Sequence, residues 1–319
     1  MPILNTLVAA LSWIGRTGTR GLAVSIFLGL AVPQLAAYVK PYLSEIVFIL
    51  LLFSYLRTDP KAFRGYLRAP ALPAAAALWV MVALPLLICS IYALSGARSM
   101  FPDLYALLIL HMVVAPLTSS AAFAALMGLD VALSLMVLIV SSALSPITSV
   151  AFSYLFLGTS LFSPIGLGVK LFFFYAASGV IAFVIRRTAG QAWIEKQRQP
   201  IDGLNMIALF AFAIVAMENV PRNVMADPLF ALGILGFVVA LACAQLALTA
   251  AVFARVGIDR SMAIGFCAAF RNLGVVMAAL GSSISDVAWF YFALVQLPIY
   301  VLPAVVNALA KRGRRVSTP

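Results

Sequence analysis

The chain has 319 residues, of which 64% are hydrophobic and only 10% are charged, and its mean hydropathy is +1.10. A soluble domain carries about 25% charged residues, so this composition excludes an ordinary soluble protein and indicates a polytopic membrane protein. The three cysteines lie in apolar stretches without paired spacing. Their positions therefore predict neither a disulfide framework nor a zinc site.

Charged residues, prolines and glycines separate ten apolar runs, which predict ten transmembrane helices. The predicted helices cover residues 21–39, 42–56, 70–94, 104–129, 131–157, 165–185, 204–217, 228–254, 261–281 and 287–310. Residues 1–20 have neither the charged start nor the cleavage site of a signal peptide, and they predict an amphipathic N-terminal segment at the membrane interface. Residues 312–319 predict a basic C-terminal tail.

The distribution of basic residues predicts that both termini are cytoplasmic. In that orientation sixteen of the 21 Lys and Arg residues lie on the inner side, Lys40, Arg98 and Arg222 lie outside, and Lys170 and Arg271 lie within helices. This asymmetry predicts a multi-pass protein of the plasma membrane, which in bacteria is the inner membrane. It also accounts for the net charge of +11 through topology and attraction to anionic lipid. The predicted partner is therefore the lipid bilayer, and no nucleic acid is needed.

The ten runs form two sets of five, residues 21–160 and 161–311, and each set has an interrupted, polar fourth member. The interruptions lie at residues 116–120 and 271–274. Because five is odd, two such repeats enter the membrane with opposite orientations, which is the inverted-repeat plan of many secondary transporters. We therefore predict an all-α polytopic membrane protein in which a ligand binds where the two broken helices approach each other.

A full positive charge, Arg271, lies in the middle of the apolar run 261–281 and is followed by Asn272 and Gly274. A charge at this depth costs roughly 2.5–3.5 kcal/mol, so it normally faces a cavity, a partner or a ligand. A charge, an amide and a flexible backbone position within one turn predict an interrupted helix that binds a ligand. The alternative is that Arg271 pairs with a neighbouring helix and serves packing alone.

The sequence resembles the bile acid:sodium symporter family over nearly its whole length. The resemblance is carried by the order and spacing of WIGRTGTRGLAVSIFLGL, SYLRTDPKAF, VALSLMVLIVSSALSPIT, GVKLFFFYAASGVIAF and AIGFCAAFRNLGVVMAAL. It implies sodium-coupled transport of organic anions by a ten-helix fold. In that fold helices 3–5 and 8–10 form a core, in which helices 4 and 9 break and cross, and helices 1, 2, 6 and 7 form a panel.

At the sodium sites that the resemblance implies, this sequence departs from the family pattern. The family's ion-site positions correspond here to Ser120, Ala121, Ser134, Leu138, Cys267 and Arg271, and a family Gln in the third helix corresponds to Val80. The family has Asn, Glu and Gln where this chain has Ala121, Cys267 and Arg271. Sodium favours several hard oxygen ligands, and most of them are missing here.

We predict a secondary transporter of an organic anion that works by alternating access with weakened or absent sodium coupling. The anion would be bile-acid-like, steroid-like or a small carboxylate. Arg271 would take the place of the sodium ion, and the substrate site would consist of Arg271, Asn272, Thr118, Ser119, Ser120 and Cys267. A sodium-coupled symporter, and a membrane receptor or lipid-binding relative that does not transport, are the open alternatives. The sequence lacks paired intramembrane carboxylates and any metal-ligand spacing, so no enzyme and no cofactor is predicted, with sodium left open.

Two further polar residues are candidates for a proton relay. His111, the only histidine, precedes the first interruption, where an imidazole that titrates near neutral pH would suit a relay. The alternative for His111 is a hydrogen-bonded packing residue. Glu45 is the only acid well inside an apolar run. It would either pair with Lys170 or Arg271, or lie as a solvated carboxylate at the edge of the helices.

Overall fold

The computed structural model describes residues 2–16, 24, 27–58, 64–159, 161–281 and 285–299. It is 87% helical, and the described residues contain no strand. Six helical stretches in this part of the chain are long and apolar enough to cross a membrane. The protein is therefore an all-α, multi-pass membrane protein, as the composition predicts.

The six long stretches are Pro33–Leu56, Ala71–Leu94, Val131–Leu157, Pro164–Ala189, Arg198–Ala226 and Pro228–Val252. The first stretch contains η1 (Pro33–Leu35), α3 (Ala36–Val39), η2 (Lys40–Tyr42) and α4 (Leu43–Leu56), and the second contains α6 (Ala71–Leu78), the π-helical turn η3 (Trp79–Ala83) and α7 (Leu84–Leu94). The third contains α11 (Val131–Phe152) and the π-helical turn η4 (Ser153–Leu157), and the fourth is α12 (Pro164–Ala189). The fifth contains α14 (Arg198–Ala216) and α15 (Val220–Ala226), and the sixth is α16 (Pro228–Val252). Short helices α5 (Arg64–Arg68), α8 (Ala97–Met100), α13 (Gln191–Lys196) and η5 (Ala254–Val256) connect them.

One predicted boundary is wrong. Lys40 and Pro41 were expected to separate two spans, but both lie in the 3-10 turn η2, inside the continuous stretch Pro33–Leu56. Pro41 occupies one of the first two positions of that turn. A backbone N–H at such a position has no partner within the helix, so a proline, which lacks the N–H, is tolerated there. Part of the predicted first helix, and of the last one beyond Asp286–Ile299, lies outside the described residues.

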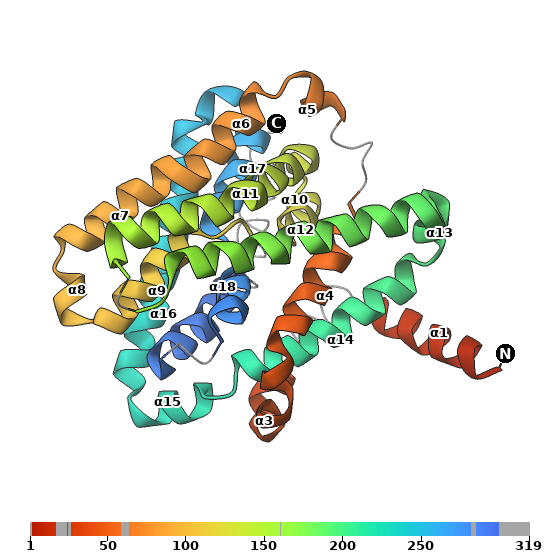
Figure 1. Ribbon diagram of the computed structural model, residues 1–319, viewed down its shortest axis with the longest axis horizontal. Helices are drawn as coiled ribbons and strands as arrows, with labels where there is room; N and C mark the ends of the chain where they lie inside the picture. The colour runs from red at the N-terminus through yellow and green to blue at the C-terminus, as the bar shows by residue number, and fades with distance from the viewer. Residues whose placement is uncertain are drawn as a thin grey trace, which may run out of the picture.

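Two pairs of short helices lie in the interior. They are α9 (Pro102–Val113) with α10 (Ser120–Met127), and α17 (Ile258–Ala269) with α18 (Leu273–Leu280). Each pair is separated by a few residues of non-helical backbone, so the interruptions expected near residues 116 and 271 are both present. In Figure 1 the long helices α11 and α12 run side by side across these short helices, and α4 passes close to α12.

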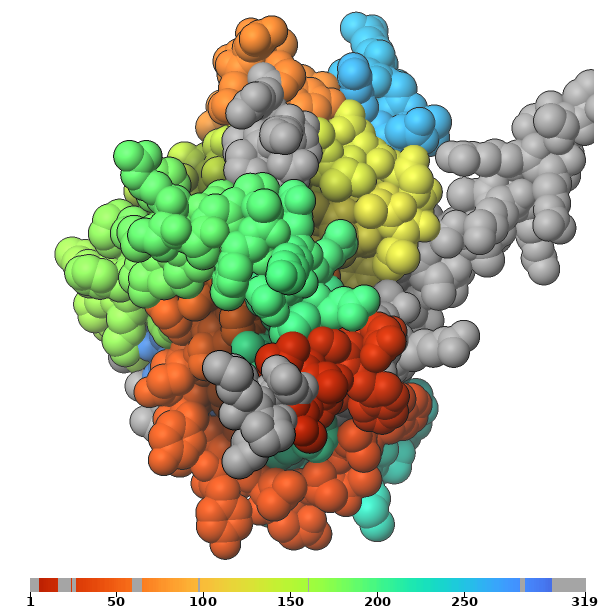
Figure 2. Space-filling model, turned by 90° about the vertical axis from the view of Figure 1, so that its right-hand side faces the viewer, coloured from red at the N-terminus to blue at the C-terminus, as the bar shows by residue number. Residues whose placement is uncertain are grey.

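The N-terminal helix α1 (Pro2–Gly15) packs along α14. The two backbones approach closely because glycines lie at the crossing: a Cβ on Gly203 would lie 2.1 Å from the Leu11 carbonyl oxygen, and one on Gly15 would lie 2.2 Å from that of Gln199. In Figure 2, α1 (red) lies at the surface of the molecule. The predicted N-terminal segment is thus a helix held against a neighbour by small residues.

Candidate functional site: the crossing of two broken helices

The two interruptions meet in the interior as an antiparallel β-bridge between Pro116 and Arg271. The Leu117 amide donates to the Phe270 carbonyl, and the Asn272 amide donates to the Ala115 carbonyl, each at 2.9 Å. Pro116 explains why α9 stops, because proline has no N–H and drives the preceding residue towards an extended conformation. The backbone is already extended at Val114, with ψ of 151°.

The Arg271 guanidinium binds three backbone carbonyls from three different parts of the chain. Its Nε donates to Ala268 at 3.1 Å, one terminal nitrogen donates to Val114 at 3.2 Å, and the other donates to Val80 at 2.8 Å. The side chain is only 1% exposed, and none of the ion pairs among the described residues includes it. A buried cation is therefore stabilised here by carbonyl dipoles and not by a carboxylate.

The local backbone explains why these carbonyls are available. Ala268 and Val114 lie at the ends of α17 and α9, where the last carbonyls of a helix have no intrahelical partner. Val80 lies in the π-helical turn η3, and such turns disturb the regular hydrogen-bond ladder of a helix. Each of the three carbonyls that bind the guanidinium thus lies where the regular helical hydrogen bonding is interrupted.

The neighbouring carbonyls at the end of α9 are also paired. Ala115 accepts from the Asn272 amide at 2.9 Å. Val113 lies 3.3 Å from the Thr148 hydroxyl on α11, which also lies within hydrogen-bond distance of the Leu144 and Ser145 carbonyls. With Val114 bound to Arg271, two successive carbonyls have donors of their own and Val113 shares one. A bare metal cation would have to displace Arg271 to use the Val114 carbonyl.

The structure brings most of the predicted substrate-site residues together at the crossing. Ser120 is buried and donates to the Leu117 carbonyl at 2.6 Å. Thr118, Ser119 and Asn272 are half-buried, and Ser54 on α4 donates to the Thr118 carbonyl at 3.1 Å. The Thr118 backbone therefore lies beside α4, whereas Arg271 is enclosed.

The predicted ion-site equivalents fall into a polar and an apolar group. The Cys267 thiol lies 3.8 Å from the Ser134 carbonyl, and the Ser134 hydroxyl donates to the Asp130 carbonyl at 3.1 Å. Leu138 is buried, and Ala121 is half-buried. Among the described residues no group of three His, Cys, Asp or Glu side chains is placed to hold a metal ion.

His111 and Glu45 take no part in the hydrogen bonds of the crossing. The His111 Nδ1 is 2.8 Å from the Tyr291 hydroxyl, and the two rings stack edge to face. Glu45 is exposed. Lys170 donates to the Ala279 carbonyl at 2.7 Å, and Arg271 binds its three carbonyls, so neither basic side chain pairs with Glu45 in this structure.

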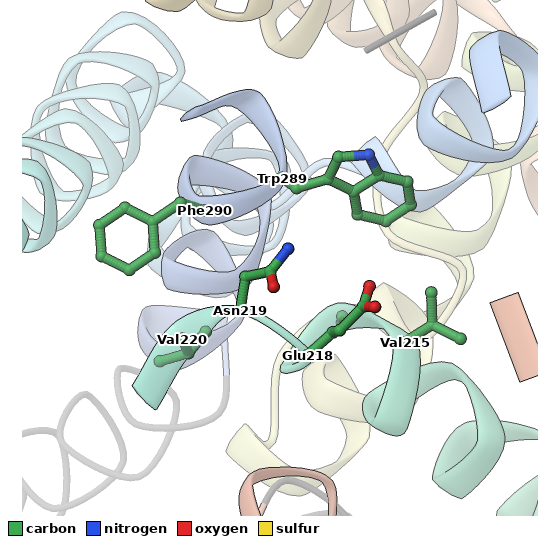
Figure 3. A pocket seen from close by; sticks show the side chains of 7 residues that line it. Val215, Glu218, Asn219, Val220, Trp289 and Phe290 are labelled. Atoms are coloured by element: carbon green, nitrogen blue, oxygen red, sulfur yellow. The ribbon is translucent and has the colours of Figure 1, made fainter. Parts of the chain in front are cut away.

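Two surface hollows lie at opposite ends of the molecule. A crevice between residues 215–220 and Trp289 has almost no internal volume (Figure 3); nearby, Lys40 pairs with Glu218 at 2.7 Å. At the other end a cleft of about 360 Å³ lies beside Asp130 and Arg260, whose charged groups are 3.4 Å apart. Tyr66 also donates to the Asp130 carboxylate. Burial, and then this contact, raise the pKa of Tyr66 to about 12.

Sequence reasoning missed the acceptors of Arg271, because backbone carbonyls carry no residue-type signal. Ser54 and Thr148 were also missed, although the hydroxyl-rich stretch SSALSPITS that contains Thr148 is visible in the sequence. No protein-family model matches this chain, and none of the curated proteins is significantly similar to it.

Proposed function

We propose that this protein is a secondary transporter of an organic anion in which Arg271 replaces the inorganic cation that such a carrier would otherwise bind. One observation carries the proposal: a single guanidinium holds three backbone carbonyls at the crossing of two broken helices. Carbonyl oxygens at helix breaks are the ligands that secondary transporters use for coupling ions. A covalently attached cation at that place satisfies the same oxygens without sodium.

The wider architecture in this proposal is the ten-helix, two-repeat fold with a core and a panel. It is supported by the two broken helices, one in each half of the chain, which meet through an antiparallel bridge. The sixteen-to-three distribution of basic residues supports cytoplasmic termini in the bacterial inner membrane. In this scheme α4 and α12 belong to the panel, and α9, α10, α17 and α18 belong to the core.

The anion would bind on the half-buried side of the crossing. Helices α10 and α18 begin there, and the first N–H groups of a helix together with its dipole favour a negative charge. Thr118, Ser119 and Asn272 supply polar side chains at these helix starts. Arg271 adds a fixed positive potential from behind, because no acidic side chain neutralises it in the described part of the chain.

Arg271 cannot itself carry a coupling proton, because the guanidinium does not deprotonate in proteins. The carrier would therefore act as a uniporter, as an exchanger or with a proton carried elsewhere. His111 is a weak candidate for that proton, because it is enclosed with Tyr291 and a second cation near Arg271 would be repelled.

The test is thermal unfolding of the purified protein during titration with sodium chloride, with potassium chloride as the control. We expect the wild type to show no sodium-specific stabilisation, and we expect Arg271→Gln to acquire one, because the three carbonyls then lose their cation. Sodium-specific stabilisation of the wild type would instead identify a sodium-coupled symporter.

Uptake of organic anions into proteoliposomes separates a carrier from a receptor. The proposal expects saturable uptake that is independent of the sodium gradient. Binding of anions without any uptake would identify a receptor that does not transport, and sodium-dependent uptake with a Hill coefficient near two would contradict the proposed role of Arg271.

A further inference from the structure

Helices α10 and α18 are the second halves of the two broken helices, and their carboxyl ends are capped differently. The end of α10 is closed by its own chain: Gly128 takes the left-handed conformation, and the Leu129 amide donates to the Ala124 carbonyl at 2.8 Å. At the end of α18 the Gly281 amide donates to the Met277 carbonyl. The last carbonyls of a helix have no partner within it, so those that follow Met277 are acceptors for other parts of the chain.

Two side chains from the proposed panel donate to these carbonyls. Ser44 on α4 donates to the Ala278 carbonyl at 3.1 Å, and Lys170 on α12 donates to the Ala279 carbonyl at 2.7 Å. A cation at the carboxyl end of a helix is stabilised by the unpaired carbonyls and by the helix dipole. The end of α18, which belongs to the proposed core, is therefore capped by the panel, and α18 cannot separate from α4 and α12 unless both bonds break.

Lys40 adds a third contact between panel and core at the same end. Its ammonium pairs with Glu218 at 2.7 Å and lies over the Trp289 ring, 5.0 Å from the centre. An ammonium above an indole face is attracted by the π electrons of the ring. The crevice between residues 215–220 and Trp289 has almost no internal volume, and Figure 3 shows Glu218 facing the helix that carries Trp289. Panel and core are therefore in contact here.

The ion pairs at the opposite end lie within one group of helices. Arg57 pairs with Asp202 at 3.0 Å, and both belong to the proposed panel. Arg260 pairs with Asp130 at 3.4 Å, both belong to the core, and the cleft of about 360 Å³ lies beside them. In Figure 1, α3 and α15 lie at the lower end of the molecule, and α5 and α10 lie in its upper part. The charged contacts between panel and core are thus found at the lower end.

We propose that the contacts at the lower end form a gate that closes the outer side of the carrier. We call Lys40, Ser44, Lys170, Glu218 and Trp289 the outer gate. This inference rests on the proposed function, whose orientation places Lys40 outside. The structure is then the outward-closed state, and an anion from outside reaches the crossing only after the panel has moved away from α18 and Trp289.

The experiment measures the separation of panel and core at this end by pulsed electron paramagnetic resonance. Spin labels are attached to Tyr38→Cys on α3 and Met100→Cys on α8, because both side chains are exposed. The full-length protein is used in lipid nanodiscs, with the exposed Cys243 replaced by alanine. We expect one predominant distance in the protein with an intact gate.

Removal of the gate contacts should add a longer distance. In Lys170→Met a charge-assisted hydrogen bond is lost, and we expect the ratio of the open to the closed state to rise about tenfold or more. In Lys40→Met the lost ion pair is partly exposed, so we expect a rise of about threefold. Lys170→Arg keeps a cationic donor at the end of α18, and its distances should stay close to those of the intact gate.

Arg57→Met is the matched control. The Arg57–Asp202 pair is 39% and 19% exposed, close to the 38% and 25% of the Lys40–Glu218 pair, but it lies within the panel. Its loss should leave the distance between the labels unchanged. If Lys170→Met does not fold, the comparison of Lys40→Met with Arg57→Met decides the question.

The remaining outcomes separate this inference from the proposed function. Unchanged distances in both Lys170→Met and Lys40→Met overturn the outer gate and leave the anion carrier intact, since anion uptake is measured independently. A shift in Arg57→Met as large as that in Lys40→Met also overturns it. If the gate variants lengthen the distance but the wild type takes up no anion, the gate contacts stand and the proposed transport falls.

Discussion

The crossing of the broken helices and the serines of α11 are two buried polar regions whose hydrogen bonding is opposite. At the crossing, the Arg271 guanidinium donates to three backbone carbonyls. On α11 and η4, the buried hydroxyl oxygens of Ser141 and Ser153 have no partner among the described residues. A buried polar group without a partner costs about 1–3 kcal/mol. The difference indicates that the crossing is complete within the protein, whereas the hydrogen bonding of these serines is not.

Removal of the crossing cation should have the largest effect. Arg271→Met leaves three buried carbonyls without their donor, and we expect the free energy of unfolding to fall by about 3–5 kcal/mol. Arg271→Lys keeps the charge, but a single ammonium cannot reach all three carbonyls in the same way, so its loss should be about half as large. Equilibrium unfolding in mixed detergent micelles measures both. A loss below about 1 kcal/mol in Arg271→Met would mean that water replaces the guanidinium without cost.

The contact between His111 and Tyr291 provides the next comparison, because it is buried like the crossing but consists of one side-chain hydrogen bond, and the other imidazole nitrogen, Nε2, has no partner among the described residues. Tyr291→Phe leaves one imidazole nitrogen without its partner, and we expect a loss of about 1–2 kcal/mol in the free energy of unfolding. The double variant with His111→Phe should lose less than the sum of the two single losses, since the stranded group is then absent. If His111 were a proton relay, Tyr291→Phe would also shift the pH dependence of uptake, and we expect no such shift.

The sequence alone predicts the breaks well, for a physical reason. Pro116 and Arg271 are residues that a regular, lipid-facing helix cannot easily accommodate, so their positions reveal both interruptions. What the sequence does not reveal is the partner of Arg271. The Val80 carbonyl becomes an acceptor through a π-helical turn, and valine in an apolar run gives no sign of that geometry.

At Lys40-Pro41 the sequence predicts a feature that the structure does not have, because a charge followed by a proline indicates the end of a helix. The stretch Pro33–Leu56 continues through them as a 3-10 turn. Lys40 extends instead to Glu218 and lies over the Trp289 ring, 5.0 Å from its centre. The long side chain therefore finds its partners in tertiary structure, which a local pattern does not contain.

The contact between Tyr66 and Asp130, beside the 360 Å³ cleft, is a third polar group, and it is partly solvated. It tests how far the stability effect of a polar contact depends on burial. Tyr66 donates to Asp130, and its pKa is raised from 10.0 to about 12. Below pH 10 the tyrosine is protonated in both states; between pH 10 and 12 the unfolded chain releases the proton first, so stability falls as pH rises. Because the group is partly solvated, we expect a contribution of only about 1 kcal/mol. The difference between wild type and Tyr66→Phe in unfolding from pH 9 to 12 measures it, and a constant difference would show that the Asp130 contact has no effect on stability.

The smallest effect is the sharpest test of the contrast between the two buried regions. Ser141→Ala and Ser149→Ala are the same chemical change on α11, eight residues apart, at two fully buried positions. Ser149 donates to the Pro146 carbonyl, so its removal should cost about 0.5–1 kcal/mol in the free energy of unfolding. Ser141 has no partner among the described residues, so its removal should be neutral or stabilising by a similar amount. Unfolding of both variants decides the matter: equal losses would mean that the Ser141 hydroxyl is already bonded, for example to water, and this part of α11 would then be as complete as the crossing.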